Sequence, residues 1–358
     1  MAGETLDIMH ILGPDNLAVE IANRWREWSE LKVKWTEEKK ELRNYLYATD
    51  TSTTGNALLP WSNTTTTPKL TQIMDNLHAN YFATLFPQQK WMRFEAETTA
   101  SNVKAKRDVI QAYMDNKVRQ SDFVNICSDL LYDWIQYGNC FATVAWEDNY
   151  QIKESGELVT QYVGPKLVRV SPYDIVFNPT ASSFTKTPKI IKSILTLGEI
   201  KKMVEADPAN DYFKQVLDKM LHARATVGNS DGMMDKASGF IADGFSSIQQ
   251  YYESNFVEIL TFYGDIYDYN EGKLWTDRII TVVDRAYIIN NEENPSWLGQ
   301  APIYHAGWRP RPDNLYAMGP LDNLVGMQYR IDHLENLKAD VFDQIAYPII
   351  KIRGDVED

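Results

Sequence analysis

Apolar residues recur at helical spacing through most of the first third of the chain. Over residues 15–47 large apolar side chains stand three or four positions apart among charged ones, and Pro14 precedes them as a helix start signal. The same spacing returns over residues 70–85 and 103–137. We therefore predict one long helix or a broken pair over 15–47 and further helices after it, with an exposed Thr-, Ser- and Asn-rich loop over 49–68.

The apolar pattern changes from helical to alternating at Gly138. Short runs of β-branched and aromatic residues follow, bounded by turn residues such as Asn178 and Pro179. These runs are residues 140–146, 158–163, 166–170 and 175–177. They predict a small antiparallel sheet within residues 138–180.

The second half of the chain alternates between helical and strand-like patterns. Helical spacing over residues 197–222 precedes a Gly-, Ser-, Asp- and Met-rich stretch, residues 225–244, which we expect to be mobile. Two strand-like runs, 256–269 and 274–289, are joined through a Gly-containing turn and predict a hairpin. Four prolines over residues 295–312 predict an extended connection.

A last amphipathic pattern runs from Leu321 to about Ile345, after the start signal of Gly319 and Pro320. Its apolar stripe consists of Leu324, Met327, Ile331, Leu334, Val341 and Ile345, with Lys338 as the one polar member. The other faces carry Asp322, Arg330, Asp332, Glu335, Asp340 and Asp343. The predicted helix is roughly 37 Å long, with one face suited to packing and mostly acidic faces elsewhere. Considered alone, such a helix is more typical of the core of an ordinary domain.

The composition is that of a folded, acidic protein. Of the 358 residues 44% are apolar and 12% aromatic, which is enough for a sizeable core and for about two or three domains. Acidic residues number 49 against 36 basic ones, so the formal net charge is -13. That balance opposes tight binding to phosphate and argues against a conventional DNA-binding domain.

Targeting signals and catalytic motifs do not stand out in the sequence. Without a bilayer-spanning apolar run or a signal peptide, we expect a soluble, unexported protein, with Cys127 and Cys140 as reduced thiols. There is no G-x-x-x-x-G-K-[ST] phosphate loop, zinc-binding pattern or calcium-loop spacing. The five histidines are scattered, so we predict no catalytic site, no metal and no cofactor.

Seven short segments, each aromatic or punctuated by Gly and Pro, follow one another along the chain. The first four are Arg43-Asn-Tyr-Leu-Tyr, Tyr81-Phe-Ala-Thr-Leu-Phe-Pro, Tyr137-Gly-Asn-Cys-Phe-Ala-Thr-Val and Val170-Ser-Pro-Tyr-Asp-Ile-Val-Phe-Asn-Pro. The last three are Val257-Glu-Ile-Leu-Thr-Phe-Tyr-Gly-Asp, Trp308-Arg-Pro-Arg-Pro-Asp and Tyr316-Ala-Met-Gly-Pro-Leu-Asp-Asn-Leu. In this colinear order the chain resembles, over residues 15–350, the portal proteins of tailed bacteriophages of the short-tailed type.

The resemblance implies an α+β subunit of a ring of twelve copies at one capsid vertex, around a channel for double-stranded DNA. It implies a helical wing region (1–137), a small antiparallel β-unit of the wing (138–180), a helical and flexible segment leading to the stem (181–255), a β-hairpin clip-like region (256–318), a stem helix (319–347) and the start of a tunnel loop (348–358). Portals continue past this helix, so the resemblance also implies the front portion of a longer protein.

The resemblance assigns roles to three groups of residues. The stripe Leu324, Met327, Ile331, Leu334, Val341 and Ile345 would pack on the stem helices of neighbouring subunits. Arg330, Asp332, Glu335, Lys338 and Asp343 are channel-lining candidates, whose acids would keep DNA phosphates from being held. Phe262, Tyr263, Trp275 and Trp308 are candidates for interactions of the clip.

The implied partners are further copies of the chain, double-stranded DNA that passes without sequence-specific binding, the terminase, a tail adaptor and the major capsid protein. The implied location is the portal vertex of the virion, and the host cytoplasm during assembly. Two other interpretations remain. One is another virion component, such as a tail adaptor, without a DNA channel. The other is an intracellular hydrolase whose site residues are dispersed along the sequence.

Overall fold

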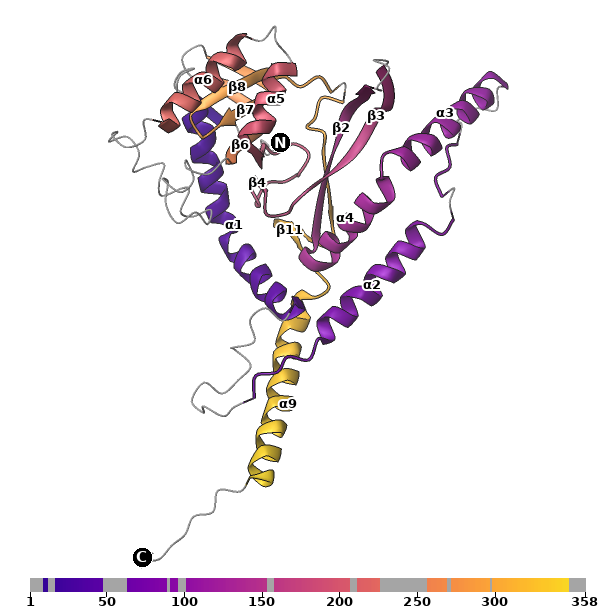
Figure 1. Cartoon of the computed structure of the whole chain (residues 1–358), viewed down its shortest axis with the longest axis vertical. Coiled ribbons are helices and arrows are strands. Elements are labelled where there is room, and N and C mark those ends of the chain that lie inside the picture. Colours follow the sequence, from indigo (N-terminus) through magenta and orange to yellow (C-terminus); the bar gives the residue numbers. More distant parts are fainter. Residues whose placement is uncertain are drawn as a thin grey trace, which may run out of the picture. The chain divides into compact units, whose positions relative to one another are not determined.

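The protein is a mixed α+β chain that divides into two compact units, described here from a computed structural model (Figure 1). The structure describes residues 9–11, 17–47, 63–88, 91–95, 101–152, 158–206, 211–225, 256–268, 272–296 and 298–347. Unit 1 comprises residues 1–34, 140–306 and 310–316, and unit 2 comprises residues 35–139, 307–309 and 317–358. Residues 49–62 of the predicted loop, most of the stretch 225–244, and residues 348–358 lie outside the described residues.

Unit 1 is built on a six-stranded sheet. Its strands are β1 (Met9–Ile11), β4 (Ile175–Phe177), β5 (Lys189–Thr196), β6 (Phe256–Asp268), β7 (Lys273–Val283) and β8 (Tyr287–Glu293). The order is β4-β5-β6-β7-β8 with antiparallel neighbours, and β1 pairs in parallel with β6. Strands β6 and β7 form the predicted hairpin, because Asp268 pairs with Lys273 across a turn in which Gly272 has φ +61.

Both faces of this sheet are covered, because alternate residues of β6 enter two different cores. Leu260 and Phe262 pack with the first half of α1 (Leu17–Tyr47), including Trp25. Val257 and Ile259, on the opposite face of the strand, pack with α5 (Leu197–Ala206) and α6 (Asp211–Ala225). A strand that is buried on both sides needs an almost continuous apolar run, which is what β6 has.

Lys32 of α1 is a fully buried cation in unit 1. Its Nζ donates to the carbonyl oxygens of Pro172, Tyr173 (3.2 Å) and Ile175 (2.9 Å), so the ammonium joins the helix to the turn before β4. Burial lowers the pKa of Lys32 to about 7, while the charge of Asp174 acts in the opposite direction.

A second sheet of three strands follows the change of pattern at Gly138. Its strands are β2 (Asn139–Ile152), β3 (Leu158–Val170) and β9 (Ile303–Gly307), in the order β3-β2-β9. Two short strands, β10 (Arg309–Arg311) and β11 (Asn314–Met318), form a separate ribbon. The stretch 295–312, predicted to be only an extended connection, therefore supplies a strand to each of two sheets. Prolines at strand ends and edges permit this.

Three sequence expectations about strands need correction. Residues 175–177 do not join the sheet of 138–180 but pair with β5 in the larger sheet. β5 itself was missed inside the region 181–255, because a strand of eight residues ahead of a helix gives little alternation to detect. The run 274–289 is two strands, since Asp284 (φ 50) and Arg285 (φ 57) form a left-handed turn between them.

Unit 2 is mainly helical. It contains the second half of α1, α2 (Lys69–Leu85), α3 (Ser101–Gln120), α4 (Phe123–Tyr137), the short 3-10 helix η5 (Asp322–Leu324) and α9 (Val325–Ala346). These helices confirm the predicted pattern over 15–47 and 70–85. The pattern over 103–137 is interrupted at Asp122, whose φ of 57 turns the chain between α3 and α4. Among the described residues no helix has the length and hydropathy needed to cross a membrane.

The core of unit 2 fixes the start of α9. Leu42 and Leu46 of α1, Leu70 of α2 and Ile135 of α4 surround Leu321, which is completely buried. Further residues packed on this core are Met74, Leu77, Tyr132, Trp134, Trp308, Leu324 and Val325. The first turn of the last helix is therefore anchored by apolar contacts.

Candidate functional site

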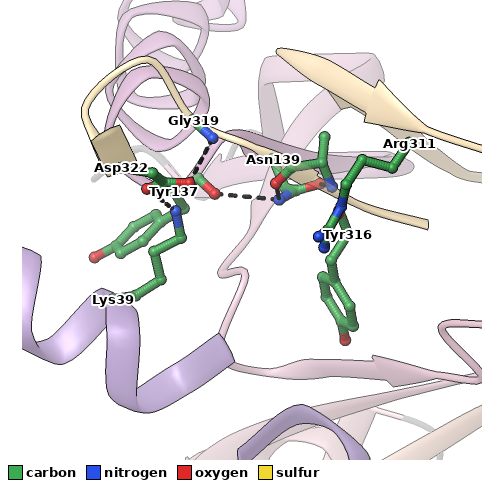
Figure 2. Close-up of polar contacts among 8 residues, drawn as sticks. Lys39, Tyr137, Asn139, Arg311, Tyr316, Gly319 and Asp322 are labelled. Carbon is green, nitrogen blue, oxygen red and sulfur yellow. Dashed lines mark hydrogen bonds and ion pairs between the residues drawn. The ribbon is translucent and has the colours of Figure 1, made fainter. Parts of the chain in front are cut away.

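The entry to α9 is held by a small polar network (Figure 2). The backbone N–H of Gly319 donates to Asp322 Oδ2 at 2.7 Å, and the other carboxylate oxygen of Asp322 pairs with the buried Lys39. Asn139 Oδ1 accepts from the N–H of Ala317 at 2.9 Å, and its Nδ2 donates to the Ala317 carbonyl at 2.9 Å. These side chains fix the backbone just before the helix begins.

Two glycines make this entry possible. A Cβ atom on Gly138 would lie 2.4 Å from the backbone nitrogen of Gly319, and Gly138 also has φ +73. Only glycine combines that conformation with such a close approach of two main chains. The Gly138 carbonyl also accepts from the N–H of Trp308 at 2.8 Å. The Gly-containing segments that mark the sequence thus meet at one junction within unit 2.

The polar face of α9 binds an extended segment, residues 63–68, which we call the strap. Asp340 Oδ1 accepts from the backbone N–H and the side-chain Nδ2 of Asn63, at 2.7 and 2.8 Å. Asn336 accepts from the N–H of Thr65 at 3.0 Å and donates to its carbonyl at 3.1 Å. Asp332 accepts from the N–H of Thr67 at 2.9 Å.

The last contact of this series is made by Gln328. Its Nε2 donates to the Thr67 carbonyl at 2.6 Å and to Asp332 Oδ1 at 2.8 Å, and its Oε1 accepts from the N–H of Leu70 at 3.2 Å. The side chains at 328, 332, 336 and 340 are four residues apart and rise about 6 Å per step, close to the spacing of alternate residues in an extended chain. One helix face therefore matches alternate backbone groups of the strap.

The apolar face of α9 points away from the strap and is exposed. The exposed fractions are 64% for Met327, 39% for Ile331, 49% for Leu334, 41% for Leu337, 52% for Val341, 67% for Phe342 and 68% for Ile345. A shallow groove runs between Ile331, Leu334, Glu335, Leu337, Lys338, Val341 and Phe342. A contiguous apolar strip of this kind is typical of an interaction surface.

The predicted packing stripe is thus placed on one open face, except for Leu324, which is partly buried on the core of unit 2. The packing of the stripe on neighbouring subunits stays a prediction. Leu337 and Phe342 were not included in the stripe, although they extend the same face. Their positions lie on either side of it, where a strict three-four spacing does not reach.

The channel-lining candidates do not share one face. Asp332 is completely buried and bound to the strap, which corrects the expectation that its carboxylate lines a channel. Asp343 is exposed but accepts from Asn63 Nδ2 at 3.1 Å, on the strap side. Arg330 and Lys338 lie in the exposed apolar face, and Lys338 pairs with Glu335 at 2.8 Å. The outward face of α9 is therefore apolar with two cations, rather than acidic.

The clip candidates are also dispersed. Phe262 is completely buried in the sheet core, which corrects its assignment to an interaction surface. Tyr263 is partly buried, and burial raises the pKa of its hydroxyl. Trp275 packs on the sheet core under the Lys273 ammonium, 3.7 Å from the ring centroid. Trp308 belongs to unit 2, where it contacts the rings of Tyr81 and Trp134.

The strap contacts were missed by sequence reasoning. Gln328, Asn336 and Asp340 stand with Asp332 at four-residue intervals, and this repeat was the available signal. Such a repeat is a weak signal by itself, because polar side chains on helices usually face water. These contacts form because the backbone N–H and C=O groups of residues 63–67 lie against the helix. Backbone groups that are buried in this way need hydrogen-bond partners.

Comparison with known proteins adds no family assignment. No protein-family model matches the sequence, and no curated protein is significantly similar to it. Within the described ranges no group of three or more His, Cys, Asp or Glu side chains is placed to hold a metal ion.

Proposed function

We propose that the chain is a ring-forming subunit of the portal type, with α9 as the element that packs against neighbouring copies. The observation that supports this is the reversed polarity of the helix. Its polar side chains, including Asp332 and Asn336, are buried against the strap, while its apolar side chains, including Leu334 and Val341, face outward. A helix whose polar face is buried and whose apolar face is exposed is typical of an interaction site, where a partner surface covers the apolar side chains.

The width of the exposed face favours two neighbours rather than one. At 100° per residue, Leu337 and Phe342 stand about 140° apart around the helix, with Leu334, Val341 and Ile345 between them. A single two-helix seam uses a narrower stripe. Contacts on both flanks suit a ring, in which each copy touches the next by the same heterologous contact until the circle closes.

The expected gain per subunit is large enough for assembly. Covering the exposed half of one aliphatic side chain contributes roughly 1 kcal/mol. The seven exposed apolar residues together therefore contribute on the order of 5–8 kcal/mol before the entropy of association is subtracted. That contribution comes from a single helix, and other surfaces of the ring would add to it.

The proposed role of the ring is that of a channel for genome packaging and ejection at the portal vertex, and of a docking site for the terminase, the tail adaptor and the major capsid protein. It rests on the resemblance of the seven colinear segments to phage portals. The buried Asp332 removes one acid from the proposed wall. Glu335 remains as a lumen candidate, whereas Arg330 and Lys338 lie within the face that is proposed to pack on neighbouring copies. The low affinity for DNA phosphate then rests on the overall charge of -13.

The assembly is tested with purified protein by native mass spectrometry and negative-stain electron microscopy. The double variant Leu334→Asp with Val341→Asp should abolish rings while leaving the helical circular dichroism unchanged. Ala346→Asp controls for the effect of an added acid, because it places one at an exposed position of the same helix outside the apolar face. Rings that survive in the double variant would show that α9 does not carry the contact.

The same images separate the portal from its nearest alternative. A portal ring has a bore wide enough for double-stranded DNA, while a tail adaptor or another virion component need not have one. For a hydrolase the described residues offer His78, whose Nε2 lies 3.0 Å from the Ser128 hydroxyl, while His305 lies against the rings of Phe141 and Phe184.

A further inference from the structure

Helix α3 carries an exposed face on which basic and apolar side chains alternate. Val109, Ile110 and Tyr113 are 70%, 49% and 47% exposed. Lys106 is exposed on the same side, and Lys117 lies over the Tyr113 ring, 5.5 Å from its centroid. At 100° per residue these five positions fall within an arc of about 100°. We call them the α3 face.

Another side of α3 packs on the rest of unit 2. Gln111 donates to the Met92 carbonyl at 2.8 Å and accepts from the N–H of Phe94 at 3.0 Å, so one side packs on residues 91–95. The two acids of the helix lie away from the α3 face. Asp108 pairs with Arg107, and Asp115 accepts from Gln111 at 2.9 Å. Among the described residues no acidic side chain lies on the α3 face, so the face itself is basic.

We infer that the α3 face docks on an acidic surface of a second copy of this chain, as the basic side of a heterologous contact between neighbouring subunits. The argument is charge complementarity. Helix α3 contains five basic and two acidic residues, a net charge of +3 in a chain of net charge -13. The remainder of each copy therefore carries -16, and a second copy offers mostly acidic surface to this helix.

The mixture of side chains favours a protein surface over other acidic partners. Lys106 and Lys117 are about 16 Å apart along the helix, which is too sparse for tight phosphate binding through clustered cations. Three apolar side chains between them gain little from a sugar-phosphate backbone. A lipid-bound helix would need a larger apolar face with more aromatic or Leu side chains. A folded protein surface can cover Val109, Ile110 and Tyr113 and pair with both lysines.

This inference rests on the proposed ring and adds an electrostatic contact to the apolar one of α9. The two contacts predict different salt responses. Burial of apolar surface on α9 is strengthened or unaffected by salt, while pairing between exposed charges is screened. Assembly of the wild-type chain should therefore weaken as the sodium chloride concentration rises, in proportion to the contribution of the α3 face.

The test compares two charge-reversal variants of the same helix by mass photometry and sedimentation velocity. Lys106→Glu with Lys117→Glu should weaken assembly about tenfold or more and remove most of its salt dependence. Lys104→Glu with Arg119→Glu makes the same change of charge on exposed positions outside the α3 face, and should change assembly less than about threefold. Circular dichroism checks that both variants keep their helices.

The outcomes separate this inference from the proposed function. Rings that form equally well in both variants overturn the docking of α3 and leave the ring itself intact. A wild-type chain that stays monomeric contradicts the proposed function and this inference together. Vesicles containing phosphatidylserine and a short double-stranded DNA serve as further probes. If the Lys106 and Lys117 variant loses binding to either while its assembly is unchanged, the face belongs to that partner, and docking on a second copy is wrong.

Discussion

The contact between α9 and the strap can be tested at its most buried member, Asp332. This carboxylate is completely buried and accepts from the N–H of Thr67 at 2.9 Å and from Gln328 Nε2 at 2.8 Å, both through Oδ1. Replacing it with alanine leaves the Thr67 N–H without its acceptor and removes a second hydrogen bond to a charged group. The expected loss in the free energy of unfolding is about 3 kcal/mol.

Asp332→Asn separates the hydrogen bonds from the charge. The amide oxygen can accept both hydrogen bonds, so the strap keeps its partners, while the buried negative charge disappears. Because a buried charge is costly to desolvate, this variant should lie within about 1 kcal/mol of the wild type. The second oxygen, Oδ2, has no hydrogen-bond partner among the described residues. The amide NH2 that replaces it is therefore a buried donor, and its desolvation offsets part of the gain from removing the charge.

The measurement is urea denaturation at a protein concentration low enough to exclude association, with hydrogen exchange of the Thr67 amide as a local readout. Asp332→Ala should accelerate that exchange, and Asp332→Asn should not. The reasoning is refuted if both variants lose the same stability, because the charge itself would then be required. It is also refuted if Asp332→Ala unfolds at the wild-type urea concentration.

Three further predictions concern the junction, the sheet and pH. Gly138→Ala should destabilise unit 2 by more than about 2 kcal/mol in thermal unfolding, because φ +73 and a 2.4 Å approach to Gly319 both exclude a Cβ atom. Unchanged stability would contradict the close approach of the two main chains at Gly138 and Gly319. Arg285→Met should lower the free energy of unfolding by about 3–5 kcal/mol, because it removes the two hydrogen bonds, at 2.8 and 2.9 Å, that Arg285 donates to the buried Glu258 carboxylate. Adding Glu258→Leu should restore most of that loss. If stability is not restored, the ion pair does not have the proposed role. Burial lowers the pKa of His305 from 6.5 to about 4, so the unfolded chain binds the proton first, and up to about 3 kcal/mol of stability should be lost as pH falls from 6.5 to 4. His305→Phe should flatten that part of the stability curve, and an unchanged slope in urea titrations would show that other groups dominate.

Much of the fold follows from the local pattern of the sequence. Helical spacing determined α1, α2 and α9, and the turn around Gly272 determined the β6-β7 hairpin. These elements are predictable because periodicity and turn chemistry are properties of neighbouring residues. The break at Asp122 and the short strand β5 were not predictable, since both depend on what the chain packs against.

The site shows the same division more sharply. The sequence by itself determined that residues 321–345 form an amphipathic helix with an apolar stripe that includes Leu334 and Val341. It did not determine which side of that helix is buried. Only the tertiary structure placed residues 63–67 along Gln328, Asp332, Asn336 and Asp340, a contact between segments more than 250 positions apart. The physical reason is that burial of a polar face is favourable only when its hydrogen bonds are made, and the partners of these side chains are backbone groups, which leave no mark in the amino-acid sequence.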